Sequence, residues 1–366
     1  MQWSLLGVAM NRALVGIVLV FSSVAFVPAA EETEKSEGVD KAIDKALEYL
    51  SNHQNDDGSW NSAQGPKNAA ITGLSVMAFL SAGHVPGEGK YGDSIKKGVE
   101  WVLKQQQTNG LIATQRHYEM YQHGICTLML AEVAGMTDGK LGEEIRTKLA
   151  KAVEIILKAQ RPQNQGEARG GWRYLVEHVR GSDISVTGWQ IMALRAAKNL
   201  GCDVPPEAIE RAVAYIKRSQ DPNSGAFRYA VHEGSRTTIA CTGTSILALE
   251  LCGKEMHRSE ELLRAGGYLL KHNPPWGYEQ ISYSMYYCSQ ACFQLGGNYW
   301  NHFKPLMHKH LLGAQESSGA WKGDQAEERS FGRHYSTSMA VLALTVEYRF
   351  LPIYQRSEEA DEKAKP

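Results

Sequence analysis

Three side chains in the sequence have the types and spacing that acid–base chemistry requires. Asp183 opens an apolar stretch that reads DISVTG, and a carboxyl group at that place can donate or accept a proton. Glu119 and His123 stand four residues apart in HYEMYQHG, so on a helix they share one face and could relay a proton or hold a metal. We therefore take Asp183, Glu119 and His123 as candidate catalytic residues. The structural alternatives are a helix N-cap for Asp183 and a simple hydrogen-bonded pair for the other two.

A second group of candidates consists mainly of aromatic side chains near the starts of apolar stretches. Aromatic rings attract cations and pack against hydrophobic ligands, so we expect these residues to line a ligand cavity. The predicted lining residues are Tyr121, Trp189, Tyr283, Tyr286, Tyr287, His334 and Tyr335. Packing in the protein core is the alternative, because residue type alone does not separate the two roles.

The cysteine spacing does not indicate a metal site. No two cysteines form a CxxC pair of the kind that zinc sites use. The six cysteines are Cys126, Cys202, Cys241, Cys252, Cys288 and Cys292. A domain of this size can bury its own core, and most of these residues sit inside apolar runs, so we predict buried free thiols, with disulfides as the alternative. No metal and no cofactor is predicted.

The elements that must position these residues follow from an internal repeat. KALEYLSNHQNDDGSW, residues 45–60, has a basic residue, a small one, an aromatic one and then Gln, Gly and Trp at fixed offsets. Five further copies follow in order, and the fifth copy has Asn273 in place of Gln. The repeated anchor residues are Gln54, Trp60, Gln106, Gln160, Trp172, Gln220, Phe227, Gln315 and Trp321. Six ordered copies of one pattern indicate a repeat architecture.

Each copy predicts a pair of helices. The first stretch of a copy is amphipathic, as in IDKALEYLSNH, and the second is apolar on all sides, as in AAITGLSVMAFLSAG. A helix with a polar face belongs on the outside, and a helix that is apolar all round should be buried. Six such hairpins give twelve helices, and all six inner helices look equally buried, which favours a closed ring over an open solenoid. The predicted fold is all-α, an α/α toroid with its inner helices around a central cavity.

The repeated turn residues are predicted to be structural. A Gln side chain has both a donor and an acceptor, so it can bridge the end of an outer helix and the start of the following inner helix. Gly permits the positive φ that a chain reversal needs, and Trp packs between neighbouring hairpins. Asp56 and Asp57 stand at turn positions that Asn109 or Asn223 fill in other copies, so turn chemistry explains these carboxylates better than catalysis.

The repeated pattern resembles a known motif. The signature K/R-G/A-x-x-aromatic-L-x-x-x-Q-x-x-x-G-x-W is similar to the QW motif of squalene–hopene and oxidosqualene cyclases, and to the repeats of protein prenyltransferase β subunits. The resemblance covers residues 40–355 and implies the α6/α6 toroid of that superfamily. The stretches YYCSQACFQLGGNYW and LPIYQR also resemble a bacterial group of exported proteins with prenyltransferase and squalene-cyclase repeats.

The residues that carry chemistry in that superfamily are not retained here. In its cyclases an Asp-x-Asp-Asp-Thr motif protonates the isoprenoid, and the middle Asp is the proton donor. Aligning Thr187 with the motif's Thr keeps Asp183 as the first acid but places Ser185 at the proton donor. Prenyltransferases hold zinc with Asp, Cys and His, and the nearest positions here are Gln280 and Ser282. The resemblance therefore implies the fold and a hydrophobic ligand, and leaves catalysis open.

The two ends of the chain differ in composition from the repeats. From Met10 the sequence reads MNRALVGIVLVFSSVAFVPAA, and a basic residue, an apolar run and small residues in that order are typical of a signal peptide. We predict a signal peptide at 1–30, a linker at 31–39, the toroid at 40–355 and a polar tail at 356–366. The protein would then be exported, periplasmic or secreted, with no transmembrane segment after cleavage. A retained signal anchor is the alternative.

Composition narrows the classes of partner. The formal net charge is -1 and no run of basic residues occurs, which argues against nucleic acid. The predicted function is binding of a hydrophobic ligand, such as an isoprenoid, by the toroid. If the protein is an enzyme, the expected activity is cyclase-like. Triterpene cyclases place their site between two toroids, so such an activity would need a partner toroid or another protein. The alternative function is a non-catalytic scaffold for a protein or a glycan.

Overall fold

The computed structural model describes most of the region in which the repeats lie. The described residues are 29–63, 65–177, 181–232, 234–253, 255–274, 280–323 and 326–355. The predicted signal peptide lies outside them except for residues 29 and 30, and so does the polar tail. Helix α1 (Ala29–Asn52) already includes residues 31–39, so the predicted linker is helical. The chain divides into two units at residue 37, and the following account concerns the unit 38–366.

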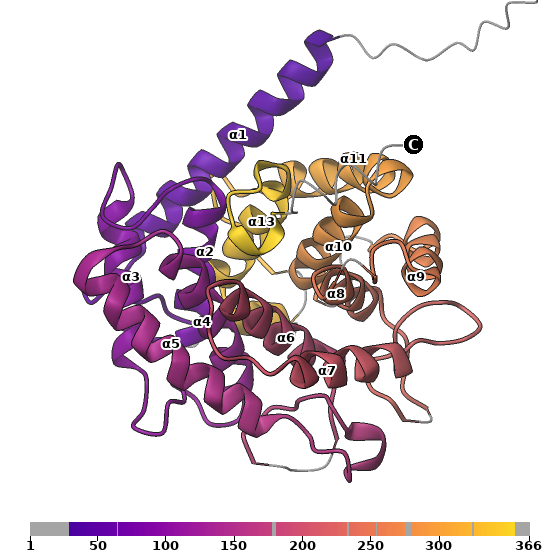
Figure 1. Cartoon of the computed structure of the whole chain (residues 1–366). Coiled ribbons are helices and arrows are strands. Elements are labelled where there is room, and N and C mark those ends of the chain that lie inside the picture. Colours follow the sequence, from indigo (N-terminus) through magenta and orange to yellow (C-terminus); the bar gives the residue numbers. More distant parts are fainter. Residues whose placement is uncertain are drawn as a thin grey trace, which may run out of the picture. The chain divides into compact units, whose positions relative to one another are not determined.

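Six helices pack side by side as an inner ring (Figure 1). They are α2 (Ala69–Ser81), α4 (Glu119–Ala134), α6 (Ile184–Asn199), α8 (Ile239–Glu250), α10 (Ile281–Leu295) and α13 (Arg333–Leu344). Each of them contacts the next, and α13 contacts α2, where the hydroxyls of Ser75 and Ser338 lie 3.2 Å apart. Every residue of α2 except Ala70 is buried. The predicted buried inner helices and the predicted closure into a ring are both confirmed.

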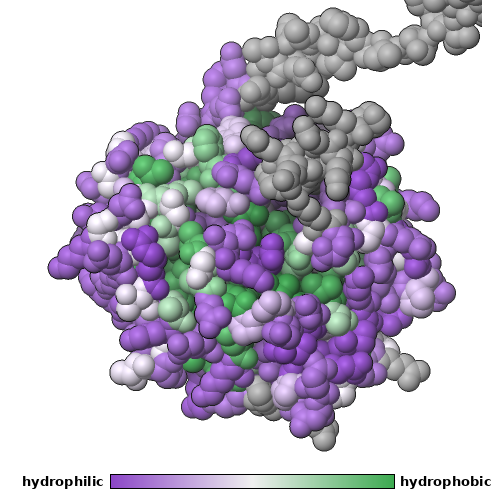
Figure 2. Space-filling model, viewed as in Figure 1, coloured by the Kyte–Doolittle hydropathy of each residue, from purple (hydrophilic) through white to green (hydrophobic). Residues whose placement is uncertain are grey.

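A second set of helices lies outside the inner ring (Figure 1). It consists of α1 from Gly38 onward, α3 (Gly92–Lys104), α5 (Gly139–Ala159), α7 (Pro206–Arg218), α9 (Glu260–Lys271) and α11 (Gly297–Ala314). The short helix α12 (Ala326–Phe331) and three 3₁₀ turns, η1 (Gly166–Ala168), η2 (Val346–Tyr348) and η3 (Pro352–Tyr354), complete the described elements. No β-strand occurs in the described part of the chain, which contains only isolated bridges. Figure 2 shows apolar residues gathered in the middle of one face, with hydrophilic residues around them.

The repeated Gln fastens each turn to the next hairpin. Nε2 of Gln54 donates to the carbonyl of Gly58 in its own turn at 2.9 Å and to that of Ser94 in α3 at 2.8 Å. The same two bonds recur from Gln106 to Gly110 and Lys148, from Gln160 to Gly170 and Ala208, from Gln220 to Gly225 and Glu261, and from Gln315 to Gly319 and Ala42. The predicted bridge within one hairpin is therefore wrong. The Gln binds the outer helix of the following hairpin, and the last turn binds the first outer helix.

The repeated Gly and the basic residue of the next copy meet at the same seam. Gly58 has a φ of +93°, and a Cβ there would lie 2.3 Å from the carbonyl oxygen of Lys97. One residue further on, a Cβ on Gly98 would lie 3.1 Å from the Trp60 ring. The small residue that follows the basic one in the motif therefore leaves room for the Trp of the preceding turn.

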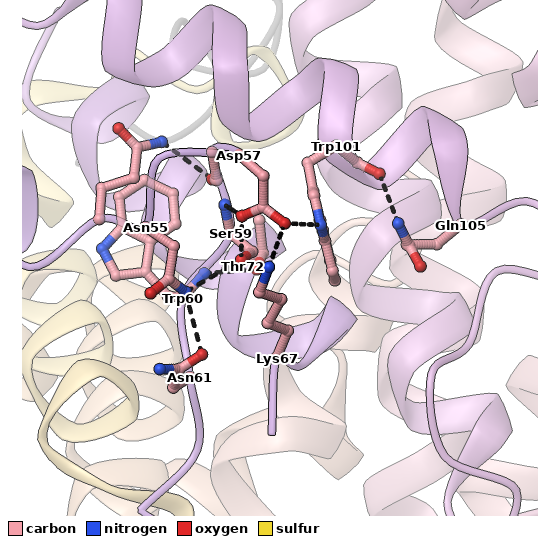
Figure 3. Close-up of polar contacts among 11 residues, drawn as sticks. Asn55, Asp57, Ser59, Trp60, Asn61, Lys67, Thr72, Trp101 and Gln105 are labelled. Carbon is pink, nitrogen blue, oxygen red and sulfur yellow. Dashed lines mark hydrogen bonds and ion pairs between the residues drawn. The ribbon is translucent and has the colours of Figure 1, made fainter. Parts of the chain in front are cut away.

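The Trp of the turn satisfies the end of its own outer helix. Nε1 of Trp60 donates to the carbonyl of Leu50 at 2.8 Å. The Trp60 N–H donates to Oγ1 of Thr72 in α2 at 3.0 Å (Figure 3). The Leu50 carbonyl lies in the last turn of α1, where its backbone partner is the His53 N–H at 3.3 Å, so the indole adds a shorter bond at the helix end. Trp172 and Trp321 bind the carbonyls of Ile156 and Leu311 in the same way.

Asp57 organises the first turn. Its Oδ1 accepts hydrogen bonds from the backbone and the hydroxyl of Ser59, and its Oδ2 accepts from Lys67 and from the indole of Trp101 at 3.1 Å (Figure 3). Burial opposes ionisation of this carboxyl, but the bonds from Lys67 and Ser59 outweigh it and lower its pKa to about 2. The bonds from Ser59 and Lys67 hold the turn and its loop together, and the bond from Trp101 fastens the turn to α3, in agreement with the structural interpretation of this residue.

Candidate functional site

Polar and aromatic side chains gather at the end of the ring where the inner helices begin, which we call the mouth. The loops that lead into α4, α6 and α8 bring them together. The mouth cluster consists of Tyr118, Tyr121, Arg173, Tyr174, Asp183, Ser185 and Tyr229. Two of these residues, Asp183 and Tyr121, were predicted from the sequence as site residues.

Asp183 is the N-cap of α6. Its Oδ1 accepts from the Val186 N–H at 2.9 Å and from the Ser185 hydroxyl at 2.6 Å. The side chain is fully buried, and Oδ2 has no hydrogen-bond partner. The guanidinium of Arg173 lies 3.5 Å from Oδ2. Burial raises the pKa of the Asp183 carboxyl, and the hydrogen bonds from Ser185 and Val186 oppose that rise without cancelling it.

The tyrosine hydroxyls of the cluster bind groups within it. The Tyr121 hydroxyl donates to Oγ of Ser185, which in turn donates to Asp183. The hydroxyls of Tyr174 and Tyr229 bind each other. Burial raises the pKa of Tyr121 well above its usual value, so this phenol stays neutral and acts as a donor. The polar ends of these rings are thus engaged inside the cluster.

The rings of the cluster form a partly exposed aromatic surface. Tyr121 stacks on Tyr174 with ring centroids 5.9 Å apart, and Tyr118 meets Tyr174 edge-on at 5.4 Å. Tyr118 is 52% exposed, the largest exposure among the large hydrophobic side chains of the described residues. The guanidinium of Arg173 lies over the Tyr174 ring, 4.7 Å from its centroid. The mouth therefore offers ring surface with one cation at its edge.

Glu119 and His123 lie on α4 but bind different backbone groups. Oε1 of Glu119 accepts from the Val176 N–H at 2.7 Å. Nδ1 of His123 lies 3.0 Å from the Ile112 nitrogen, and its Nε2 lies 2.9 Å from the Ala152 carbonyl. A neutral imidazole has one acceptor and one donor, and both are used here. Burial lowers the pKa of His123 to about 4, so the ring is uncharged at neutral pH.

The role of His123 follows from its place in the repeat. In four other hairpins a Thr of the inner helix accepts the N–H of the Trp or Phe in the turn. These pairs are Thr72 with Trp60, Thr187 with Trp172, Thr242 with Phe227 and Thr337 with Trp321. His123 accepts the N–H of Ile112, which stands at the Trp position of the second copy. The sequence carried a signal for this bond, because Thr or His precedes Gly at 72–73, 123–124, 187–188 and 242–243.

Three of the predicted lining residues form a packed aromatic cluster inside the ring. Trp189 stacks on Tyr286 with centroids 5.9 Å apart, and Tyr287 meets Tyr286 edge-on at 4.7 Å. Tyr287 is fully buried, and the other two are 1% exposed. The Tyr286 hydroxyl binds that of Tyr354 near the C-terminus. The space that sequence analysis assigned to a cavity is filled at this level by side chains, as in the core-packing alternative.

The remaining predicted lining residues lie near the mouth, at different places around the ring. Tyr283 of α10 is 8% exposed, and its hydroxyl lies 3.4 Å from the Ser185 carbonyl, so it adjoins the mouth cluster. His334 and Tyr335 lie at the start of α13, which is opposite α6 in the order of the ring. Nδ1 of His334 lies 3.0 Å from the Asn61 carbonyl. These two residues are not brought to Asp183.

A polar groove beside the mouth was not predicted. Its volume is about 770 Å³, and it lies between the second turn, Glu119 and the segment at 176–177. The wall carries Arg116, Lys158 and Glu177 together with amide and hydroxyl side chains. The loop that forms one wall belongs to the insertion in the third copy. The other copies have no corresponding residues, so the repeat could not be used to predict the position of this loop.

The described residues hold no group of three or more His, Cys, Asp and Glu side chains that could bind a metal ion. All six cysteines are free thiols, and five of them are buried, whereas Cys202 is half-buried. Burial raises the pKa of Cys241 and of Cys252 to about 12. No described helix is both long and apolar enough to cross a bilayer.

Comparison with known proteins identifies the type of fold. No protein-family model matches the chain, and no curated protein matches it. Among solved structures, the chain is similar to a GH76A α-1,6-mannanase from Salegentibacter sp. HEL1_6, with 12% identity and a TM-score of 0.63 over 85% of this chain and 99% of the mannanase. The fold is an α/α toroid.

Other similar structures have different activities. A type II terpene cyclase from Scytonema in complex with merosterolic acid A is 16% identical, with a TM-score of 0.57 over 87% of this chain and 99% of the cyclase. A D-mannose isomerase is 12% identical, with a TM-score of 0.61 over 88% of this chain and all of the isomerase. At these identities the likeness shows the toroid alone, because one fold carries many activities.

Proposed function

We propose that this toroid binds a hydrophobic ligand at the mouth cluster, outside the cytoplasm, without chemical turnover. An isoprenoid with an oxygen-bearing head group is the ligand class. The observation that carries the proposal is the aromatic surface of Tyr118, Tyr121 and Tyr174. Because two of these three hydroxyls are engaged inside the cluster, the surface presents ring carbon to a ligand.

The charged residues of the cluster support a role in orientation. Arg173 is 28% exposed at its side chain and lies at the edge of the Tyr174 ring, where it can bind an oxygen of a ligand head group. Asp183 is buried next to it, and the ion pair between its Oδ2 and the guanidinium, 3.5 Å apart, keeps Arg173 in place. Aromatic ring surface combined with one fixed polar anchor is a usual composition of a small-molecule site.

The environment of Asp183 argues against alkene protonation. That reaction needs an unusually strong acid, whereas burial raises the pKa of Asp183 and makes it a weaker one. Ser185 occupies the place of the proton donor in the cyclase motif and is itself a donor to Asp183. Binding therefore fits the cluster better than cyclisation does.

Lipid capture tests the proposal. The purified protein is incubated with a membrane lipid extract, washed and analysed by mass spectrometry. We expect an unchanged isoprenoid lipid to be retained, and retention to fall by about tenfold in Tyr121→Ala and Tyr174→Ala, since each removes one wall of the aromatic surface. Tyr268→Ala, on the outer helix α9, is the matched control and should retain the lipid. Repeated extractions that yield no lipid contradict the proposal, and a cyclised product contradicts binding without turnover.

A glycan scaffold is the second candidate, and the groove beside the mouth favours it. Its charged and amide side chains suit a hydroxylated ligand better than a hydrocarbon. A glycan array distinguishes the two functions. Binding that is lost in Arg116→Ala but kept in Tyr174→Ala assigns the function to the groove.

A further inference from the structure

The last described residues of the chain fill the axis of the ring. Residues 351–354, which we call the axial plug, follow α13 and the 3₁₀ turn η2. Leu351, Ile353 and Tyr354 are 3%, 5% and 6% exposed, so the segment is part of the interior. Tyr354 reaches Tyr286 in α10, where the two hydroxyls bind each other. The plug's other partner, Glu132, stands near the last residue of α4, so the plug lies toward the end of the ring opposite the mouth.

The plug joins two sides of the ring that face each other. The Ile353 N–H donates to Oε2 of Glu132 in α4 at 3.2 Å, whereas Tyr354 binds Tyr286 in α10. In the order α2, α4, α6, α8, α10, α13, the helices α4 and α10 are opposite one another. Contacts with α6 complete the seat of the plug. A segment that reaches both α4 and α10 must lie across the axis.

The plug is a small unit with its own internal hydrogen bonds. The N–H of Tyr354 donates to the Leu351 carbonyl within the plug. The flanking Gln355 donates its N–H to the Pro352 carbonyl and its Nε2 to the carbonyl of Arg349, just before the plug. Two hydrogen bonds described above join the plug to the ring, one from Ile353 to Glu132 and one between Tyr354 and Tyr286. The unit can leave the ring without losing its internal bonds, so opening is local and does not require the ring to unfold.

The seat beneath the plug has the composition of a binding pocket. Trp189, Tyr286 and Tyr287 supply a continuous aromatic floor. On the same helix as Tyr286, the Tyr287 hydroxyl and Oε1 of Gln290 are buried without a hydrogen-bond partner. Glu132, which is 1% exposed, contributes a carboxyl group. An aromatic floor with unpaired polar atoms matches small-molecule and peptide sites more closely than an ordinary core.

We propose that the axial plug occupies in cis a pocket that binds a hydrophobic peptide segment in trans. The trans segment presents a backbone N–H to Glu132 and a phenol to Tyr286, as the plug does. The plug is thus an autoinhibitory contact, and a partner that carries such a segment replaces it. This pocket is separate from the mouth cluster, so the proposal does not depend on the proposed lipid binding.

Peptide binding to a displaced-plug variant tests this inference. Ile353→Asp places a charged carboxylate in the buried apolar seat and should expel the plug from the intact chain. The probe is the fluorescein-labelled pentapeptide Leu-Pro-Ile-Tyr-Gln, measured by anisotropy. We expect it to bind the variant about tenfold or more tightly than the unchanged protein. Phe350→Asp adds the same charge to an exposed neighbour, 49% exposed, and should bind no better than the unchanged protein.

Two further results decide the outcome. A folded Ile353→Asp variant that binds the peptide no better than the unchanged protein overturns the proposal, and so does binding that is unaffected when the tyrosine of the peptide is replaced by alanine. If the variant does not fold, amide hydrogen exchange on the unchanged protein decides. The Ile353 amide should exchange about tenfold or more faster than the amides of α4, and exchange only through global unfolding contradicts a displaceable plug.

Discussion

The backbone N–H of Ile112 donates to Nδ1 of His123 at 3.0 Å, in the place where other hairpins use a threonine hydroxyl. This contact turns a candidate catalytic base into a structural acceptor. The same helix position in the first hairpin is Thr72, which accepts from Trp60 at 3.0 Å. The two side chains differ in size and chemistry but satisfy the same donor.

Replacement of His123 tests its structural role. We expect His123→Thr to keep the fold, because the hydroxyl can reach the Ile112 N–H as Thr72 reaches Trp60. His123→Ala should lower the free energy of unfolding by about 1–3 kcal/mol more, since it leaves a buried N–H unpaired. Urea denaturation of both variants measures the difference. Equal stability of the two variants contradicts the assigned bond.

His123 also predicts how stability depends on acid. Its folded pKa of about 4 lies below the unfolded value of about 6.5, so only the unfolded state gains a proton between these values. Stability contributed by the neutral ring is complete above the unfolded pKa and declines as the pH falls toward 4. The decline is at most about 1.4 kcal/mol per pH unit. Denaturation curves between pH 4 and 7 should show it, and His123→Thr should show a weaker dependence.

Glu132 predicts a change in the opposite direction. Burial raises its pKa to about 8, whereas its unfolded value is about 4.3. Between these values the unfolded state releases a proton that the folded state keeps, so stability is greatest below the unfolded pKa and falls as the pH rises toward 8. Glu132→Gln should remove this slope, and Glu119→Gln on the same helix should not. Urea midpoints from pH 5 to pH 8 measure both, and parallel curves for Glu132→Gln and the unchanged protein contradict the expectation.

Removal of the seam glutamines tests closure of the ring. Gln106→Ala removes two hydrogen bonds at an internal seam, and Gln315→Ala removes the corresponding two at the seam with α1. In a closed ring both substitutions should lower the free energy of unfolding by similar amounts, about 1–3 kcal/mol. An open solenoid would tolerate Gln315→Ala much better. Denaturation of the two variants under the same conditions separates these cases.

Substitution of Asp183 separates its capping from its charge. Asp183→Asn keeps an oxygen that can accept from Val186, whereas Asp183→Ala removes it and should cost about 0.5–2 kcal/mol of stability. Only the loss of charge frees Arg173, so Asp183→Asn should weaken lipid retention at the mouth while the thermal midpoint changes little. Retention that is unchanged in Asp183→Asn shows that the charge has no part in binding.

The architecture could be predicted because the same sequence pattern for helices and turns occurs in all six copies. Alternation of amphipathic and fully apolar stretches fixes outer and inner helices, and the turn residues fix the hairpins. The partner of the repeated Gln could not be predicted. Its acceptors, such as the Ser94 and Ala42 carbonyls, are backbone groups. Every residue has such a carbonyl, so the residue type gives no sign of which one is bound. Periodicity identifies which segment is repeated, but it does not identify which copy a side chain binds.

The candidate site was predicted less well, for reasons that particular residues make plain. Glu119 binds the N–H of Val176, which lies in an insertion outside the repeat. Tyr174 and Tyr229 lie in the loops before α6 and α8. They join the candidate site through a hydrogen bond between these two loops, which the sequence pattern does not predict. The aromatic residues of the core could not be separated from cavity walls, because Tyr354, which packs against Tyr286, comes from a short segment without periodicity.

The bond from Gln315 to Ala42 has a consequence for the ancestry and engineering of the molecule. The seam it makes has the same chemistry as the four seams made by the other glutamines. The ring contacts therefore do not determine which hairpin must come first in the sequence. A circular permutant opened at another turn, with a linker across the present ends, would encode the same contacts, and duplication of one ancestral hairpin could have built the ring from any starting point.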